Sequence, residues 1–125
     1  MSKVERIHSN LYFVKDLAKT ADFYKKLGFD IEQGGEEVRI KLHDFTLCFM
    51  DESKVSIDKE VGITPKGTGV FTYVEVENVD EQYSLVVKNG VETSSDPTSF
   101  PWGKREFAVK DPDGYKIVFY HKENA

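Results

Sequence analysis

The sequence predicts an α+β protein built from two tandem βαβββ modules, which form a curved mixed sheet with the helices on its outer face. Two amphipathic segments carry the same caps: Asp16 and Asn78 suit an N-cap, and Gly28 and Gly90 suit the left-handed position after a helix. Each pair of equivalent caps lies 62 residues apart, and strand-like segments surround both helices. These observations indicate two copies of one structural unit in succession.

The first module is predicted to start with a strand over 7–14 and a helix over 17–27. Leu17, Ala21 and Tyr24 fall on one face of this helix. Three strands are expected after it, at 30–33, 38–42 and 45–50, the second with regular alternation of apolar and charged residues.

The second module is predicted to repeat this order, with a helix over 79–89. Its Val79, Tyr83 and Val86 occupy the positions that are apolar in the first helix. Pro112 and Gly114 suit a tight turn between the last two strands, because Pro presets φ and Gly accepts a positive φ. The strands are expected at 70–76, 91–94, 105–109 and 116–120.

The segment 51–69 is charged and rich in Gly and Pro, so it is predicted to be a connector. We expect one domain over residues 1–125, with module 1 at about 4–50 and module 2 at about 70–122.

The composition restricts the class of function. The chain has 125 residues and a formal net charge of −5 with no basic stripe, which argues against nucleic-acid binding. No segment is apolar and long enough for a membrane span, so no membrane association is expected. Cys48 is the only cysteine, which excludes an intramolecular disulfide and fits a reducing, cytoplasmic location.

Two motifs carry a resemblance to a known family. The first is Asp22-Phe23-Tyr24-Lys25-Lys26-Leu27-Gly28-Phe29, and the second is Trp102-Gly103…Arg105…Phe107…Asp111-Pro112-Asp113-Gly114. With the tandem plan, they resemble the vicinal oxygen chelate superfamily of glyoxalase I, fosfomycin-resistance enzymes, extradiol dioxygenases and bleomycin-resistance proteins. The resemblance covers nearly the whole chain and implies the glyoxalase/bleomycin-resistance fold, which hosts several chemistries.

The resemblance implies four positions for metal ligands, normally His and Glu, on the first and last strands of each module. Carried onto this sequence, these positions hold Ser9, Cys48, Phe71 and Val118. Valine and phenylalanine offer no donor, and one thiol cannot supply the ligand number that a divalent ion requires. We therefore expect no metal, no cofactor and no catalytic residue, although the absence of enzyme activity is left open.

His8 lies one residue from an expected ligand position. A shift of one residue turns a strand side chain to the other face, so His8 reaches the cavity only if a β-bulge resets the register. His43 and His121 are interpreted as an edge residue and a residue of the C-terminal tail. Cys48 lies between apolar residues of a strand and is interpreted as an inert thiol.

The residues that alternate with the lost ligand positions predict an apolar, aromatic concave groove suited to an organic ligand. Trp102, the only tryptophan, is expected on a loop near this groove as a stacking platform for a planar or cationic ligand, or else as a lid or dimer contact. The predicted ligand-binding residues are Phe13, Cys48, Met50, Phe71, Tyr73, Trp102, Val118 and Tyr120.

Three functions are compatible with this pattern. The favoured one is a metal-independent protein that binds a small aromatic or amphipathic molecule as a homodimer, as the resemblance to bleomycin-resistance proteins implies, with antibiotic resistance as an implied role. The second is a metal-dependent lyase or dioxygenase of the glyoxalase type. The third is a non-catalytic interaction domain.

Overall fold

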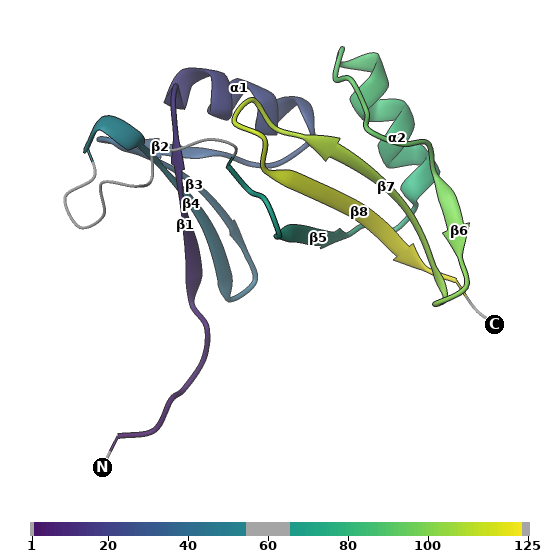
Figure 1. Cartoon of the computed structure of the whole chain (residues 1–125), viewed down its shortest axis with the longest axis horizontal. Coiled ribbons are helices and arrows are strands. Elements are labelled where there is room, and N and C mark those ends of the chain that lie inside the picture. The colour runs from purple at the N-terminus through teal and green to yellow at the C-terminus, as the bar shows by residue number, and fades with distance from the viewer. Residues whose placement is uncertain (1, 55–65, 124–125) are drawn as a thin grey trace.

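The fold consists of two modules of the same topology, seen in a computed structural model that describes residues 2–54 and 66–123 (Figure 1). Each module contributes one four-stranded mixed sheet, with strand orders β1-β4-β3-β2 and β5-β8-β7-β6. The repeated order confirms the predicted fold class. The elements of module 1 are β1 (Ser9–Val14), α1 (Leu17–Lys26), β2 (Glu32–Gly34), β3 (Glu37–Leu42), β4 (Phe45–Asp51) and the 3-10 helix η1 (Glu52–Lys54). Those of module 2 are β5 (Phe71–Glu75), α2 (Val79–Lys88), β6 (Thr98–Phe100), β7 (Lys104–Lys110) and β8 (Lys116–Lys122).

The helix caps form as the sequence predicts. The Asp16 carboxylate accepts a hydrogen bond from the Lys19 amide, and Asn78 Oδ1 accepts from the amides of Asp80 and Glu81. These bonds satisfy amides of the first helical turn that have no partner within the helix. Among the described residues, no helix is long and apolar enough to cross a membrane.

One hydrophobic core lies between the helices and the sheets. Side chains of a strand alternate between its two faces, so every second strand residue enters this core. The strand residues that face the helices are buried within the core or packed against it, among them Tyr12, Val14, Leu47, Phe49, Val74, Ile117 and Phe119.

The two modules share this core and several direct contacts. The hydroxyls of Tyr12 and Thr72 are hydrogen-bonded at 3.1 Å between β1 and β5, which are edge strands of their sheets. The Tyr115 hydroxyl donates to the carbonyl of Phe13 at 3.0 Å. Both helices lie on the same side of the sheets in Figure 1, so the opposite face of each sheet is left uncovered by helices. We call this the open face.

The prediction of a strand over 91–94 was wrong. Thr93 makes one isolated bridge with Val109, but the ladder stops because the amide of Ala108 bonds to the Ser95 hydroxyl and Pro97 has no amide hydrogen to donate. Pairing with β7 resumes only at Thr98, where β6 begins.

The connector predicted over 51–69 begins later than expected, because regular structure continues to Lys54. Asp51 belongs to β4, and Glu52–Lys54 form η1. Residues 55–65 lie outside the described residues. The turn after β7 forms as predicted, with Gly114 at a φ of 102° and the strands paired through Lys110 and Lys116.

Candidate functional site

The predicted binding residues of the strands share the open face. Their register confirms the alternation, because Phe13 lies opposite Met50 in the β1–β4 pair and Tyr73 lies opposite Val118 in the β5–β8 pair. Exposure differs strongly along this face, from 58% for Phe71 to 5% for Val118. The geometry brings these residues to one side of the sheets, and their binding of a ligand stays a prediction.

The polar centre of the open face is Glu106 on β7. This carboxylate is buried, at 7% exposure, and each of its oxygens accepts one hydrogen bond. The Tyr73 hydroxyl donates to Oε1 at 3.3 Å, and the Trp102 indole Nε1 donates to Oε2 at 3.0 Å. Burial and the neighbouring Glu106 charge raise the pKa of Tyr73, which keeps its hydroxyl protonated as a donor.

Two tyrosine rings stand beside this carboxylate. Tyr120 lies opposite Glu106 in the β7–β8 register, and its ring centroid is 5.8 Å from that of Tyr73 with the planes inclined by 61°. The ammonium of Lys104 sits 4.5 Å from the Tyr120 centroid and 5.3 Å from that of Tyr73. Such distances are typical of cation–π contacts, so this pair of rings already holds a cation.

Trp102 is held in position although it is 60% exposed. Its ring stacks on Phe100 with centroids 4.5 Å apart and planes within 4°, while its indole N–H is fixed by Glu106. An exposed aromatic ring that is fixed on one face and at one edge is preorganised for contact with a planar molecule, since little conformational entropy remains to be lost. We call the set Tyr73, Phe100, Trp102, Lys104, Glu106 and Tyr120 the Glu106 cluster.

The open face of module 1 is different in chemistry. Cys48 pairs with Arg39 in the register, and burial followed by the nearby Glu37 charge raises the pKa of the Cys48 thiol. The Nε of Arg39 is buried and has no hydrogen-bond partner among the described residues, while its Nη1 lies 3.4 Å from Glu37. A thiol with a raised pKa is a poor nucleophile at neutral pH, which matches its interpretation as inert.

The four positions implied for a metal do not fit one. Ser9 and Cys48 lie on the sheet of module 1, and Val118 is buried with no donor atom in its side chain. The Phe71 ring faces the Lys116 ammonium at 5.6 Å, so a cationic side chain stands beside this position. Among the described residues, no group of three or more His, Cys, Asp or Glu side chains could hold a metal ion. We therefore derive no chemistry through a metal.

The histidines take other roles. His8 precedes β1, and β1 runs along β4 in unbroken register from Ser9 to Val14, so the bulge that His8 requires does not form. His43 occupies the β3–β4 turn with a φ of 53°. The interpretation of His121 as a tail residue was wrong, since it belongs to β8 and its Nδ1 accepts a hydrogen bond of 2.8 Å from the Val79 amide.

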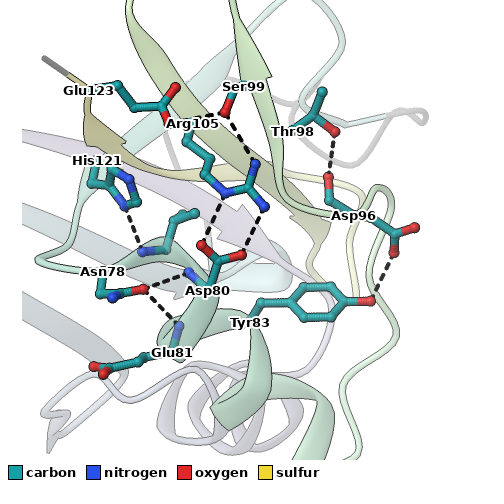
Figure 2. Close-up of polar contacts among 11 residues, drawn as sticks. Asn78, Asp80, Glu81, Tyr83, Asp96, Thr98, Ser99, Arg105, His121 and Glu123 are labelled. Atoms are coloured by element: carbon teal, nitrogen blue, oxygen red, sulfur yellow. Dashed lines mark hydrogen bonds and ion pairs between the residues drawn. The ribbon is translucent and has the colours of Figure 1, made fainter.

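His121 is part of a polar cluster on the helix side of β7 and β8 (Figure 2). Arg105 makes a bidentate pair with Asp80, at 3.0 Å for both bonds, and also donates to the Ser99 hydroxyl. Figure 2 shows these side chains converging on the start of α2, where they fix the helix to the sheet. Arg105 lies opposite His121 on the helix side of β7, away from the open face.

A cavity of about 410 Å³ lies between the modules. It runs along the outer edge of β5 and the β3–β4 hairpin. Tyr73 is the only predicted binding residue that lines it. Its lining residues are Ile40, Leu42, His43, Phe45, Leu47, Thr72, Tyr73, Val74 and Glu75.

Sequence reasoning missed Glu106 and Lys104 as site residues. A signal was present, because both lie an even number of residues from Ala108, which pairs with Val118, and therefore share its face. The burial of Glu106 could not be read from the sequence, because it depends on ring positions from β5 and from the turn before β7.

Comparisons with known proteins agree on the fold. Residues 6–119 match the model of the Glyoxalase/Bleomycin resistance protein/Dioxygenase superfamily. A glyoxalase/bleomycin resistance protein/dioxygenase from Nocardioides superposes with a TM-score of 0.82 at 20% identity, over 100% of this chain and 88% of the other. A hypothetical protein from S. aureus gives 0.79 at 23% identity, over 96% and 95%.

An antibiotic binding protein from Streptomyces sp. CB03234, TnmS3, gives a TM-score of 0.74 at 23% identity, over 98% of this chain and 100% of the other. At these identities the likeness concerns the fold alone. A search of the curated proteins found no match.

Proposed function

Because the chain belongs to the glyoxalase/bleomycin resistance protein/dioxygenase superfamily, we propose that it binds a small aromatic or amphipathic organic molecule on its open face without a metal ion. The observation that carries this proposal is the Glu106 cluster. A buried carboxylate fixes an exposed tryptophan beside two tyrosine rings, which combines apolar contact area with a polar group that orients a ligand. The donor-poor set Ser9, Cys48, Phe71 and Val118 supports a role without a metal.

The likeness to an antibiotic binding protein suggests sequestration of a toxic compound as one use of such a site. Under this proposal the protein acts stoichiometrically, and its ligand leaves chemically unchanged. Apolar exposure on the open face, 45% for Leu11 and 58% for Phe71, supports a homodimer in which a second copy covers part of this face. The single free Cys48 fits the proposed cytoplasmic location.

The test is a panel of aromatic and amphipathic compounds, followed by Trp102 fluorescence and by thermal unfolding. Since Trp102 is the only tryptophan, its emission reports on the Glu106 cluster alone. A bound ligand raises the midpoint of unfolding in proportion to the logarithm of its concentration. Trp102→Phe, which has no indole emission and is therefore followed by thermal unfolding alone, should retain the fold and show a smaller rise in the midpoint with ligand.

Other results would favour the alternatives. A divalent ion bound in stoichiometric amount to protein purified without chelator contradicts the metal-free reading and supports a lyase or dioxygenase. The cavity along the outer edge of β5 is the observation that favours an interaction domain, because extended peptides add to such edges. Protection of the Thr72–Glu75 amides by a peptide, with no response to any compound, would support that role. Sedimentation velocity decides between monomer and homodimer.

A further inference from the structure

Within the described part of the chain, the buried carboxylate of Glu106 has no charged partner at ion-pair distance. Both of its bonds come from neutral donors, Tyr73 and Trp102, and no Lys, Arg or His nitrogen of residues 2–54 and 66–123 lies within ion-pair distance. Removing a carboxylate from water without a counter-charge is costly, and neutral hydrogen bonds offset only part of that cost. A positively charged group next to Glu106 would offset more of it.

The tyrosine rings provide a second, independent attraction for positive charge. The Lys104 ammonium lies over both the Tyr73 and Tyr120 rings, where the negative ring faces attract a cation. This lysine has a flexible stem and can extend its ammonium into water, so the position over the rings is exchangeable. Lys104 thus shows where a ligand's charge would sit.

The fixed indole of Trp102 adds a requirement on shape. Its ring stacks flat on Phe100, so the cluster presents aromatic planes at one side of the carboxylate. Planar molecules gain most from such surfaces, because offset stacking needs extended contact between rings.

We propose that the ligand of this site is a planar aromatic cation, whose charge takes the place of the Lys104 ammonium between the two tyrosine rings and next to Glu106. This inference rests on the proposed function and specifies its ligand class. The binding is non-covalent, and the ligand's charge is complementary to the formal net charge of −5 of the chain.

A matched pair of probes tests the charge requirement. N-methylquinolinium and quinoline have nearly the same plane and size, but only the first carries a permanent positive charge near neutral pH. The titration is followed by the single indole N–H signal of Trp102 in NMR spectra. We expect the cation to bind about tenfold more tightly than the neutral probe at low salt, with the difference shrinking as salt is added.

Two variants identify the responsible groups. Glu106→Gln keeps one acceptor oxygen, which can serve the Trp102 indole N–H, while its new NH2 group can donate to the Tyr73 hydroxyl. Because the variant lacks the negative charge, it should lose most of the preference for the cation. Lys104→Met vacates the position over the rings, so it should tighten binding of N-methylquinolinium and leave quinoline unchanged. Glu92→Gln, at an exposed residue outside the Glu106 cluster, removes the same charge elsewhere and should preserve the preference.

The outcomes separate the inference from the proposed function. Equal binding of both probes by the native protein overturns the charge requirement and leaves the binding function standing. Failure of N-methylquinolinium to bind also overturns it, and the compound panel then decides the binding function. If Glu106→Gln does not fold, Lys104→Met and the salt dependence still test the inference. An affinity for N-methylquinolinium that changes neither in Lys104→Met nor with added salt contradicts it.

Discussion

The Tyr24 hydroxyl on α1 donates a hydrogen bond of 2.8 Å to Oδ2 of Asp111 in the β7–β8 turn. Both residues are buried, with exposures of 1% and 4%. Oδ1 of the same carboxylate accepts from the amides of Asp113 and Tyr115. A helix of module 1 thereby holds the turn that sets the register of β8, on which Tyr120 depends.

We expect Tyr24→Phe to lower the free energy of unfolding by about 2 kcal/mol, because it leaves a buried carboxylate oxygen without its donor. Urea unfolding measures the change. Tyr83→Phe is the matched control, since the Tyr83 hydroxyl bonds to an exposed Asp96 and its loss should have little effect. Equal losses in both variants would contradict a special role for the Asp111 contact.

Stability should depend on pH through Asp111. Burial raises the pKa of this carboxyl above its ordinary value of 3.8, against the opposing effect of its hydrogen bonds. The folded protein therefore holds the proton more tightly than the unfolded chain does. As pH rises from about 3.8 through the raised pKa of the folded state, deprotonation of Asp111 lowers the free energy of unfolding.

Asp111→Asn cannot titrate and should lack this contribution. The free energy of unfolding should be measured for both proteins over a pH series. As pH rises, that of the native protein should fall relative to that of the variant. A difference that stays constant would show that folding leaves the pKa of Asp111 unchanged, and a shift the other way would show that folding lowers it; either result contradicts the prediction.

Gly67 and Gly90 form a matched pair with similar positive φ values, 74° and 83°. An added Cβ at Gly90 meets open space, so Gly90→Ala should cost only the conformational strain, about 1–2 kcal/mol. At Gly67 the Cβ would lie 2.9 Å from Tyr115 Cα, which is backbone and cannot yield easily. We expect Gly67→Ala to cost about 1–3 kcal/mol more, and thermal unfolding of both variants checks the order.

Cys48 should react slowly with alkylating reagents at neutral pH. Burial and, after it, Glu37 raise the pKa of the thiol, which lowers the fraction of thiolate. Glu37→Gln removes a negative charge and should speed alkylation about threefold or more. Glu36→Gln, in the exposed turn beside it, should leave the rate unchanged; an equal acceleration would point to a change in solvent access instead.

The helices and their caps could be predicted because their signals are local. Asp16 and Asn78 act on amides two or three residues away, so the sequence contains the whole interaction. Alternation likewise predicted which strand residues share a face, because it needs only the strand's own pleat.

The predictions that were wrong or incomplete depend on interactions between segments that are distant in the sequence. Whether 91–94 or 98–100 pairs with β7 depends on Ser95 competing for the Ala108 amide, which no local pattern reveals. His121 became a cap for α2 because β8 extends past its predicted end to reach the Val79 amide. Glu106 became the centre of the candidate site only through donors that tertiary structure supplies.

β7 has consequences for how this protein can evolve. Its neighbouring residues Arg105 and Glu106 serve opposite sides of the sheet, one anchoring a helix and the other organising the candidate site. Substitutions at either position can alter one role independently of the other. A single-residue insertion or deletion within the strand that no β-bulge absorbs would exchange the two sides and remove both roles together.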